Sequence, residues 1–208
     1  MEVFSAQACI RFGWETFKKR PWYLVGIMVL TSIPQAVFGI ATNHTAGVSN
    51  GIITLLSWIV QILVGFATLC FFIRAHDDIE HVTLHDLWRP NLVWKYAIAG
   101  FLQFLALIGG LILLIVPGII FGIMFGFATY LAIDQALRPM EAMRESRRIT
   151  DGHKWELFLL GFLSLLIGIL GFICLLVGLL AAIPVIYLSA VHAYRVLQQQ
   201  AGPRPITA

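Results

Sequence analysis

Long apolar runs alternate with short charged stretches along this chain, and the runs come in pairs. Every Lys, Arg, Asp and Glu lies within residues 2–20, 74–95, 134–156 or 195–204. A helix needs about 20 apolar residues to cross a hydrocarbon layer of about 30 Å. The pattern therefore predicts six membrane-spanning helices, at about residues 22–42, 51–73, 96–115, 117–135, 156–173 and 175–195.

The predicted fold class is all-α: a polytopic transmembrane helical bundle whose six spans form three hairpins. The connections inside the hairpins are short and uncharged, at residues 43–50, 116–118 and 175–178. The apolar runs are continuous, whereas a transmembrane β-barrel requires alternating polarity, so helices are favoured. We expect a single transmembrane domain over residues 1–197 and a flexible cytoplasmic tail over residues 198–208.

The distribution of positive charge predicts the orientation of the bundle. All 14 Lys and Arg residues lie in the two terminal stretches and the two longer loops. The positive-inside rule therefore places both termini in the cytoplasm. Each hairpin also begins on this side with a tryptophan, a residue that favours the headgroup level. These residues are Trp22, Trp94 and Trp155.

Composition supports membrane insertion and limits the partners. Hydrophobic residues make up 59% of the chain and charged residues 12%, against about 25% charged residues in typical soluble domains. The net charge of +3 is explained by anionic lipid headgroups and does not indicate nucleic acid. We therefore expect membrane lipids as partners, and a homo-oligomer or a membrane-protein partner as the alternatives to a solitary bundle.

Two charged stretches are predicted to form short amphipathic helices on the cytoplasmic side. The first has apolar residues at helical spacing, which is typical of a helix lying in the interface plane; they are Val3, Ala6, Ile10, Trp14 and Phe17. In the second, Pro139 suits a first helical position and basic residues follow acidic ones, which predicts a helix over 139–150. This helix either docks a partner or acidic lipid, or simply connects two spans beneath the bundle.

The loop between the second and third spans is the nearest approach to a metal site. His81 and His85 are four residues apart and would share one face of a helix, as zinc ligands on helices do. Thr83 and Asp86, however, have the spacing of a capping box, which would start a helix after His81. The two histidines are therefore weak candidates, and we expect a polar loop without a metal.

Small residues recur at every fourth position in several spans. They let helices approach closely, which is a main source of helix association in lipid. We therefore predict helix packing at Gly118, Gly122, Gly126, Gly161, Gly168 and Gly171. The predicted helix contacts form either within one bundle or between copies of the chain.

Polar groups inside the spans are few. The candidates for lining a cavity are Gln35, Gln61 and Gln103. No acidic or basic residue falls near a predicted midplane, although proton relays and ion pathways normally carry such charges. The sequence also lacks GxSxG, HExxH and P-loop motifs. We therefore expect no enzymatic activity, no catalytic residue and no cofactor.

The second half of the chain resembles a known family. Two runs carry the resemblance, VPGIIFGIMFGFATYLAIDQALRPMEAMRESRRITDGHKWELFLLGFLSLL and LLVGLLAAIPVIYLSAVHAYRVL. The matching positions are Pro117, Gly118, Glu141, Ala142, Ser146, Gly152, Trp155, Pro184 and Tyr194. On these residues the chain resembles the YciC-like family of six-span bacterial inner-membrane proteins of unknown function. It is also similar to the membrane domain of some glycerophosphodiester phosphodiesterases. The resemblance implies a six-span architecture in the bacterial inner membrane and brings no catalytic residues.

Two hypotheses for the function follow. The first is a non-enzymatic accessory or scaffold protein of the membrane, concerned with envelope homeostasis. The second is a transporter or channel for a small neutral or lipid-like molecule. A cavity lined by the three glutamines would favour transport, whereas a glycine-packed bundle with a groove open to lipid would favour the scaffold.

Overall fold

The computed structural model describes residues 4–43, 48–77, 90–174 and 177–202, and within these ranges the chain is helical without strands. The helices are α1 (Ala6–Lys19), α2 (Pro21–Asn43), α3 (Val48–Asp77), α4 (Pro90–Leu113), α5 (Ile115–Phe125), α6 (Ala128–Asp134), α7 (Pro139–Thr150), α8 (Lys154–Ile173) and α9 (Val177–Gln200). The all-α fold class is confirmed. His81 and His85 lie outside the described residues.

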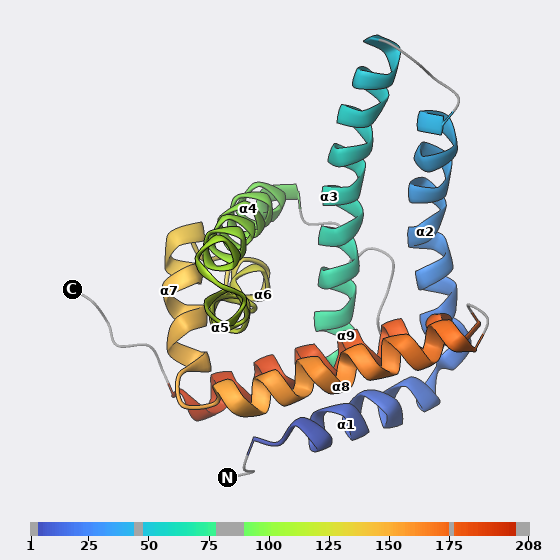
Figure 1. Ribbon diagram of the computed structural model, residues 1–208. Helices are drawn as coiled ribbons and strands as arrows, with labels where there is room; N and C mark the ends of the chain where they lie inside the picture. The colour runs from blue at the N-terminus through green and yellow to red at the C-terminus, as the bar shows by residue number, and fades with distance from the viewer. Residues whose placement is uncertain (1–3, 44–47, 78–89, 175–176, 203–208) are drawn as a thin grey trace.

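Six segments are long and apolar enough to cross a membrane, and they form the three predicted hairpins. The first hairpin is α2 and α3, the second is α4 with α5 and α6, and the third is α8 and α9 (Figure 1). Helix α7 begins at Pro139 and ends at Thr150, which confirms the second predicted surface helix. The chain is therefore an integral membrane protein by the length and composition of its helices.

The fourth span differs from the expected continuous helix, because it is interrupted between α5 and α6. At the break, the backbone N–H of Phe127 donates to Ser146 Oγ at 3.2 Å, and Ser146 Oγ donates to the carbonyl of Met124 at 2.9 Å. Thr150 Oγ1 lies 3.4 Å from the same carbonyl. Two hydroxyl groups of α7 thus satisfy backbone groups that the helix leaves unpaired, as a buried break requires.

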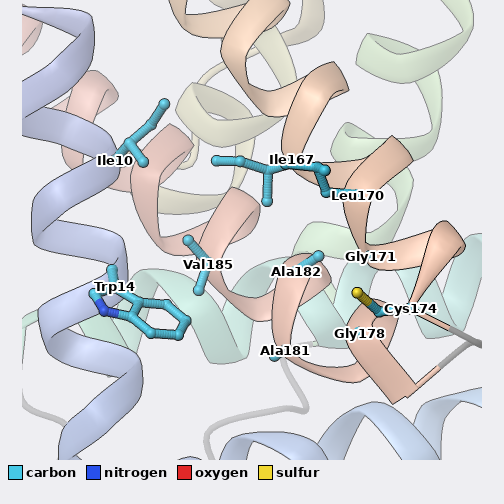
Figure 2. Close-up of a pocket in the computed structure, with 10 residues that line it drawn as sticks. All are labelled: Ile10, Trp14, Ile167, Leu170, Gly171, Cys174, Gly178, Ala181, Ala182 and Val185. Carbon is cyan, nitrogen blue, oxygen red and sulfur yellow. The ribbon is translucent and has the colours of Figure 1, made fainter.

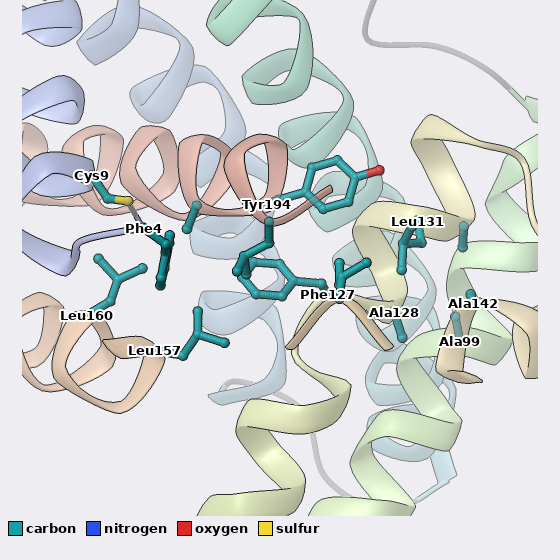
Figure 3. Packing of buried hydrophobic residues seen from close by; sticks show 14 of the residues in the cluster. Phe4, Cys9, Ala99, Phe127, Ala128, Leu131, Ala142, Leu157, Leu160 and Tyr194 are labelled. Atoms are coloured by element: carbon teal, nitrogen blue, oxygen red, sulfur yellow. The ribbon is translucent and has the colours of Figure 1, made fainter. Parts of the chain in front are cut away.

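The buried core lies at one end of the molecule, where the three hairpins meet. Helix α9 is its centre and contacts α1, α2, α3, α7 and α8. One buried cluster extends from α1 and α8 across Tyr194 and Phe127 to α6, α7 and α4 (Figure 3). A second cluster joins the base of α2 and α3 to α9, around Phe66, Phe72 and Leu188.

Away from this end the hairpins leave the common base in different directions (Figure 1). Many of their apolar side chains are exposed there. The exposed apolar residues include Leu55 and Trp58 on α3, Phe104 and Ile112 on α4, and Phe172 on α8. In water such surfaces would be unfavourable, but in a bilayer they match the lipid tails. The apolar halves of the hairpins are thus suited to contact lipid.

Helix α1 forms as expected but packs more deeply than a helix lying flat in the interface. Its buried residues are Ala6, Cys9, Gly13, Thr16 and Phe17, of which all but Phe17 are small, and the helix lies along α9 (Figure 1). A Cβ atom added to Gly13 would lie 2.6 Å from the backbone carbonyl oxygen of Val185. Trp14 remains half exposed. The close contact with α9 therefore depends on small residues such as Gly13, whereas Trp14 stays outside it.

Candidate functional site

The last turns of α3, α6 and α9 bring charged and polar side chains together at the base of the hairpins. Each is the final helix of its hairpin, so all three return to the same side of the molecule. Helix α3 supplies His76 and Asp77, α6 supplies Asp134, and α9 supplies His192 and Arg195. We call these five residues the polar junction.

Arg195 connects two carboxylates of the polar junction. Its Nη1 donates to Asp134 Oδ2 at 2.9 Å and its Nη2 to Asp134 Oδ1 at 3.1 Å, a paired geometry that strengthens ion pairs. The same Nη2 donates to Asp77 Oδ2 at 2.7 Å. Tyr194 adds a hydrogen bond from its hydroxyl to Asp134 Oδ2 at 2.8 Å. One guanidinium group therefore ties the third hairpin to both others.

The Arg195–Asp134 pair is largely shielded from solvent, with side-chain exposures of 21% and 16%. Asp77 is more open, at 44%. The Nε atom of Arg195 is buried and has no hydrogen-bond partner within the described residues. An enclosed charge is costly without its counter-charge, so the two carboxylates and the guanidinium stabilise one another only while the three helices stay together.

Two histidines extend the junction towards α1. His76 Nε2 lies 3.1 Å from His192 Nδ1, and His76 Nδ1 lies 3.2 Å from Asp77 Oδ1. The ring of Phe12 stacks on His192 with centroids 4.0 Å apart and an interplanar angle of 10°. A hydrogen bond between two imidazoles requires one to donate and the other to accept. The pair is therefore compatible with at most one protonated ring in this geometry.

A second clamp fixes the carboxyl end of α9 against α7. Arg148 donates from Nε and Nη2 to the carboxylate of Glu145, at 2.9 and 2.7 Å. Its Nη1 also donates to the carbonyl of Ala201 at 2.8 Å. Because α9 continues to Gln200 and Arg148 holds the next residue, the beginning of the expected flexible tail is packed against the fold.

The predicted packing glycines lie in three different environments. Gly118, Gly122 and Gly171 lie at close contacts inside hairpins. A Cβ atom added to each would lie 2.7 Å from Leu111 Cγ, 3.3 Å from Leu107 and 3.0 Å from Ala182, respectively. Gly126 lies at the break after α5, where its nearest neighbours belong to its own helix. Gly161 and Gly168 have no atom within 4 Å of an added Cβ, which leaves them on an open face of α8.

The three glutamines do not come together. Gln35 and Gln61 are exposed on α2 and α3, and Gln103 is half-buried on α4. None of them lines the groove beside α1 or the groove between α4 and α7. The described residues also contain no group of three or more His, Cys, Asp or Glu placed to hold a metal ion.

Among the surface grooves of the described residues are two that border α1 or α7. The first has a volume of about 460 Å³ and separates Ile10 and Trp14 of α1 from the α8–α9 hairpin, with Leu170 and Val185 on its walls (Figure 2). Its lining is almost entirely apolar. The second, about 520 Å³, lies between α4 and the first turns of α7 and carries two arginines.

No contact among the residues of the polar junction was predicted from the sequence. The sequence does contain one signal for it, because a charged residue lies near the end of the second helix of each hairpin. These residues are Asp77, Asp134 and Arg195, and the arginine is opposite in charge to the two aspartates. Helices that return to one side of a membrane bring such residues to one level. Which of them pair still depends on the packing of α9 between the other hairpins.

The chain is similar in sequence to proteins of mycobacteria. No family model matches the chain, and no solved structure matches it. The chain is 33% identical to the uncharacterized protein Mb2590 of Mycobacterium bovis and to the uncharacterized protein MT2637 of Mycobacterium tuberculosis. Each alignment covers 93% of this chain and 69% of the relative. The uncharacterized protein Rv2560 of M. tuberculosis is 30% identical over the same shares.

Proposed function

The chain belongs to the family of these mycobacterial proteins, and we propose that it is a non-enzymatic accessory or scaffold protein serving envelope homeostasis. We place it in the bacterial inner membrane with both termini in the cytoplasm. The observation that carries the proposal is the polar junction, which ties three lipid-exposed hairpins together at the end that also bears α1 and α7. The resemblance to the YciC-like six-span proteins agrees with this assignment.

The location of the junction supports a platform that faces the cytoplasm. The described ion pairs, including those of Arg195 and Arg148, lie at the base of the hairpins or on the surface helices there. The exposed face of α7 carries Met140, Arg144 and Arg147 on the same side. Positive charge near the membrane surface favours the cytoplasmic leaflet. A partner would therefore meet a fixed, positively charged surface.

The orientation can be tested with the native cysteines. Cys174 is exposed at the end of α8, whereas Cys9 and Cys70 are buried. A membrane-impermeant maleimide added to spheroplasts should label Cys174, and a cysteine placed at Asp151 should react only after the membrane is opened. Two results would overturn the orientation: labelling of Asp151→Cys from outside, or labelling of Cys174 only in inverted vesicles.

The scaffold role can be tested by site-specific photo-crosslinking in native membranes. We expect a crosslinker at Arg147 on α7 to trap one protein of discrete mass, and a crosslinker at the lipid-exposed Phe101 of α4 to trap lipid. The Arg147 adduct should weaken when Arg195→Gln loosens the junction. Lipid adducts alone at both positions would contradict the scaffold role. Turnover of any lipid by the purified protein in nanodiscs, measured by mass spectrometry, would contradict its non-enzymatic character.

The alternative, a transporter for a lipid-like molecule, is favoured by the apolar groove beside Trp14. A groove between an interfacial helix and a membrane hairpin has the polarity that an acyl chain requires. Proteoliposomes containing a fluorescent phospholipid distinguish the two functions. Protein-dependent transfer of the probe between leaflets, reduced by filling the groove with Ala182→Phe, would establish transport and displace the scaffold proposal.

A further inference from the structure

The groove between α4 and α7 combines charge with an apolar wall. Its lining consists of Ile98 and Leu102 from α4 and, from α7 and the residue before it, Arg138, Pro139, Met140, Glu141 and Arg144. Both arginines are exposed, and neither forms a salt bridge among the described residues. Two guanidinium groups beside an aliphatic surface are complementary to the two parts of an anionic membrane lipid, its charged headgroup and its apolar acyl chain.

The walls of this groove are fixed to each other. Ala99 on α4 and Ala142 on α7 are completely buried and face each other in the core (Figure 3). Lys95 Nζ donates to the carbonyl of Ala136, before α7, at 2.6 Å. The close approach of the two alanines leaves the larger Ile98 and Leu102 at the mouth. The groove is therefore preformed, which lowers the cost of binding.

The depth of the groove matches a lipid rather than a soluble anion. Trp94 is exposed near the start of α4, where tryptophan marks the headgroup level. At 1.5 Å per residue, Ile98 and Leu102 lie about 6 and about 12 Å further along the helix axis. An anionic group held by the arginines would thus sit at the surface, with an acyl chain continuing over the two aliphatic residues.

We propose that this groove binds an anionic glycerophospholipid, with its phosphate between Arg138 and Arg144 and one acyl chain along Ile98 and Leu102. Arginine is well suited to phosphate because its planar donors match two oxygens. Glu141 reduces the net charge of the lining to +1, and its carboxylate accepts the backbone N–H of Arg138 at 3.3 Å. The proposal rests on the membrane insertion in the proposed function, and it is independent of the scaffold role.

The test measures phosphatidylglycerol binding to the purified full chain by native mass spectrometry after exchange into neutral detergent. Arg138→Gln with Arg144→Gln should weaken binding at least tenfold. The matched control Arg147→Gln removes an exposed arginine of the same helix that does not line the groove, and it should change binding less than twofold. Equal losses in both variants would reduce the effect to unspecific surface charge and overturn the proposal.

Two further measurements identify the molecule that binds in the groove. Leu102→Trp, which fills the apolar wall without changing charge, should weaken phosphatidylglycerol at least fivefold, while Phe101→Trp on the neighbouring exposed surface should not. Inorganic phosphate and glycerol phosphate at 100-fold excess should fail to displace the lipid. Displacement by either would identify a site for a soluble anion, and equal binding of phosphatidylcholine or phosphatidylethanolamine would refute the preference for an anionic lipid. Both results leave the scaffold test unaffected.

Discussion

Replacing Arg195 by Gln removes the cation that joins the three hairpins. The side chain makes two hydrogen bonds to Asp134 and one to Asp77. Gln keeps the first methylene groups of the side chain, but it is uncharged, and its amide is too short to reach the carboxylates as the guanidinium does. The variant therefore leaves two carboxylates close together without their counter-charge, and we expect it to weaken the contact between hairpins.

The size of the effect follows from the exposure of each pair. The Asp134 pair is largely shielded, and removing one partner of a buried ion pair costs about 3–5 kcal/mol. The Asp77 pair is more open, and exposed pairs contribute about 0–1 kcal/mol. The remaining exposure of Arg195 lowers the first figure, so we expect a loss of about 2–3 kcal/mol in the free energy of unfolding.

Reversible unfolding in mixed detergent micelles, monitored by far-UV circular dichroism, measures this loss. Arg11→Gln is the control, because the Arg11–Glu15 pair lies on the exposed side of α1 and should contribute nothing measurable. Asp134→Asn completes a double-mutant cycle, in which the cost of Arg195→Gln should fall below about 1 kcal/mol. A loss equal to that of the control, or one unchanged by Asp134→Asn, would refute the junction as the clamp.

Three further predictions concern packing and reactivity. Gly13→Ala should lower the melting temperature by several degrees because its methyl group would meet the α9 backbone, whereas Gly161→Ala, with open space around it, should not lower it. Ser146→Ala should cost about 1–3 kcal/mol, because it leaves buried backbone groups at the α5–α6 break unpaired; a cost no larger than that of an exposed serine would contradict this role. Burial raises the pKa of the Cys9 thiol to about 11, so below that pH maleimide should react with exposed Cys174 and spare Cys9; equal rates in the folded protein would contradict the burial of α1.

Much of the fold could be predicted because hydrophobic length alone determines where helices can cross a membrane. The helix from Pro139 to Thr150 could also be predicted, since a first-turn proline and the order of its charges mark both ends. The break between α5 and α6 was not. It depends on Ser146 and Thr150, which belong to another helix and reach the gap only after α7 folds against it.

The candidate sites were harder to predict because the signal is tertiary. A glycine stripe on α8 has the same sequence pattern whether it meets a neighbour, as Gly171 does, or faces open space, as Gly161 does. Gly13 was not predicted as a packing residue, because the apolar pattern of α1 includes Ile10 and Trp14, whereas the buried face is turned towards Cys9 and Gly13. Gln35 and Gln61 are exposed on the first hairpin, and Gln103 lies on the second, which runs in a different direction away from the base (Figure 1).

Joining the hairpins only at their base has a mechanical consequence. Membrane-crossing helices are tilted by up to about 40° from the bilayer normal, and the tilt is set by contacts with neighbours and by interfacial anchors. Here the described contacts between hairpins gather around α9 and the polar junction, whereas the apolar halves are exposed. Regions with few buried contacts open and reorient most easily. We therefore expect the exposed halves of the hairpins to adjust to the surrounding bilayer more easily than their bases, which the two buried clusters and the ion pairs of Arg195 hold together.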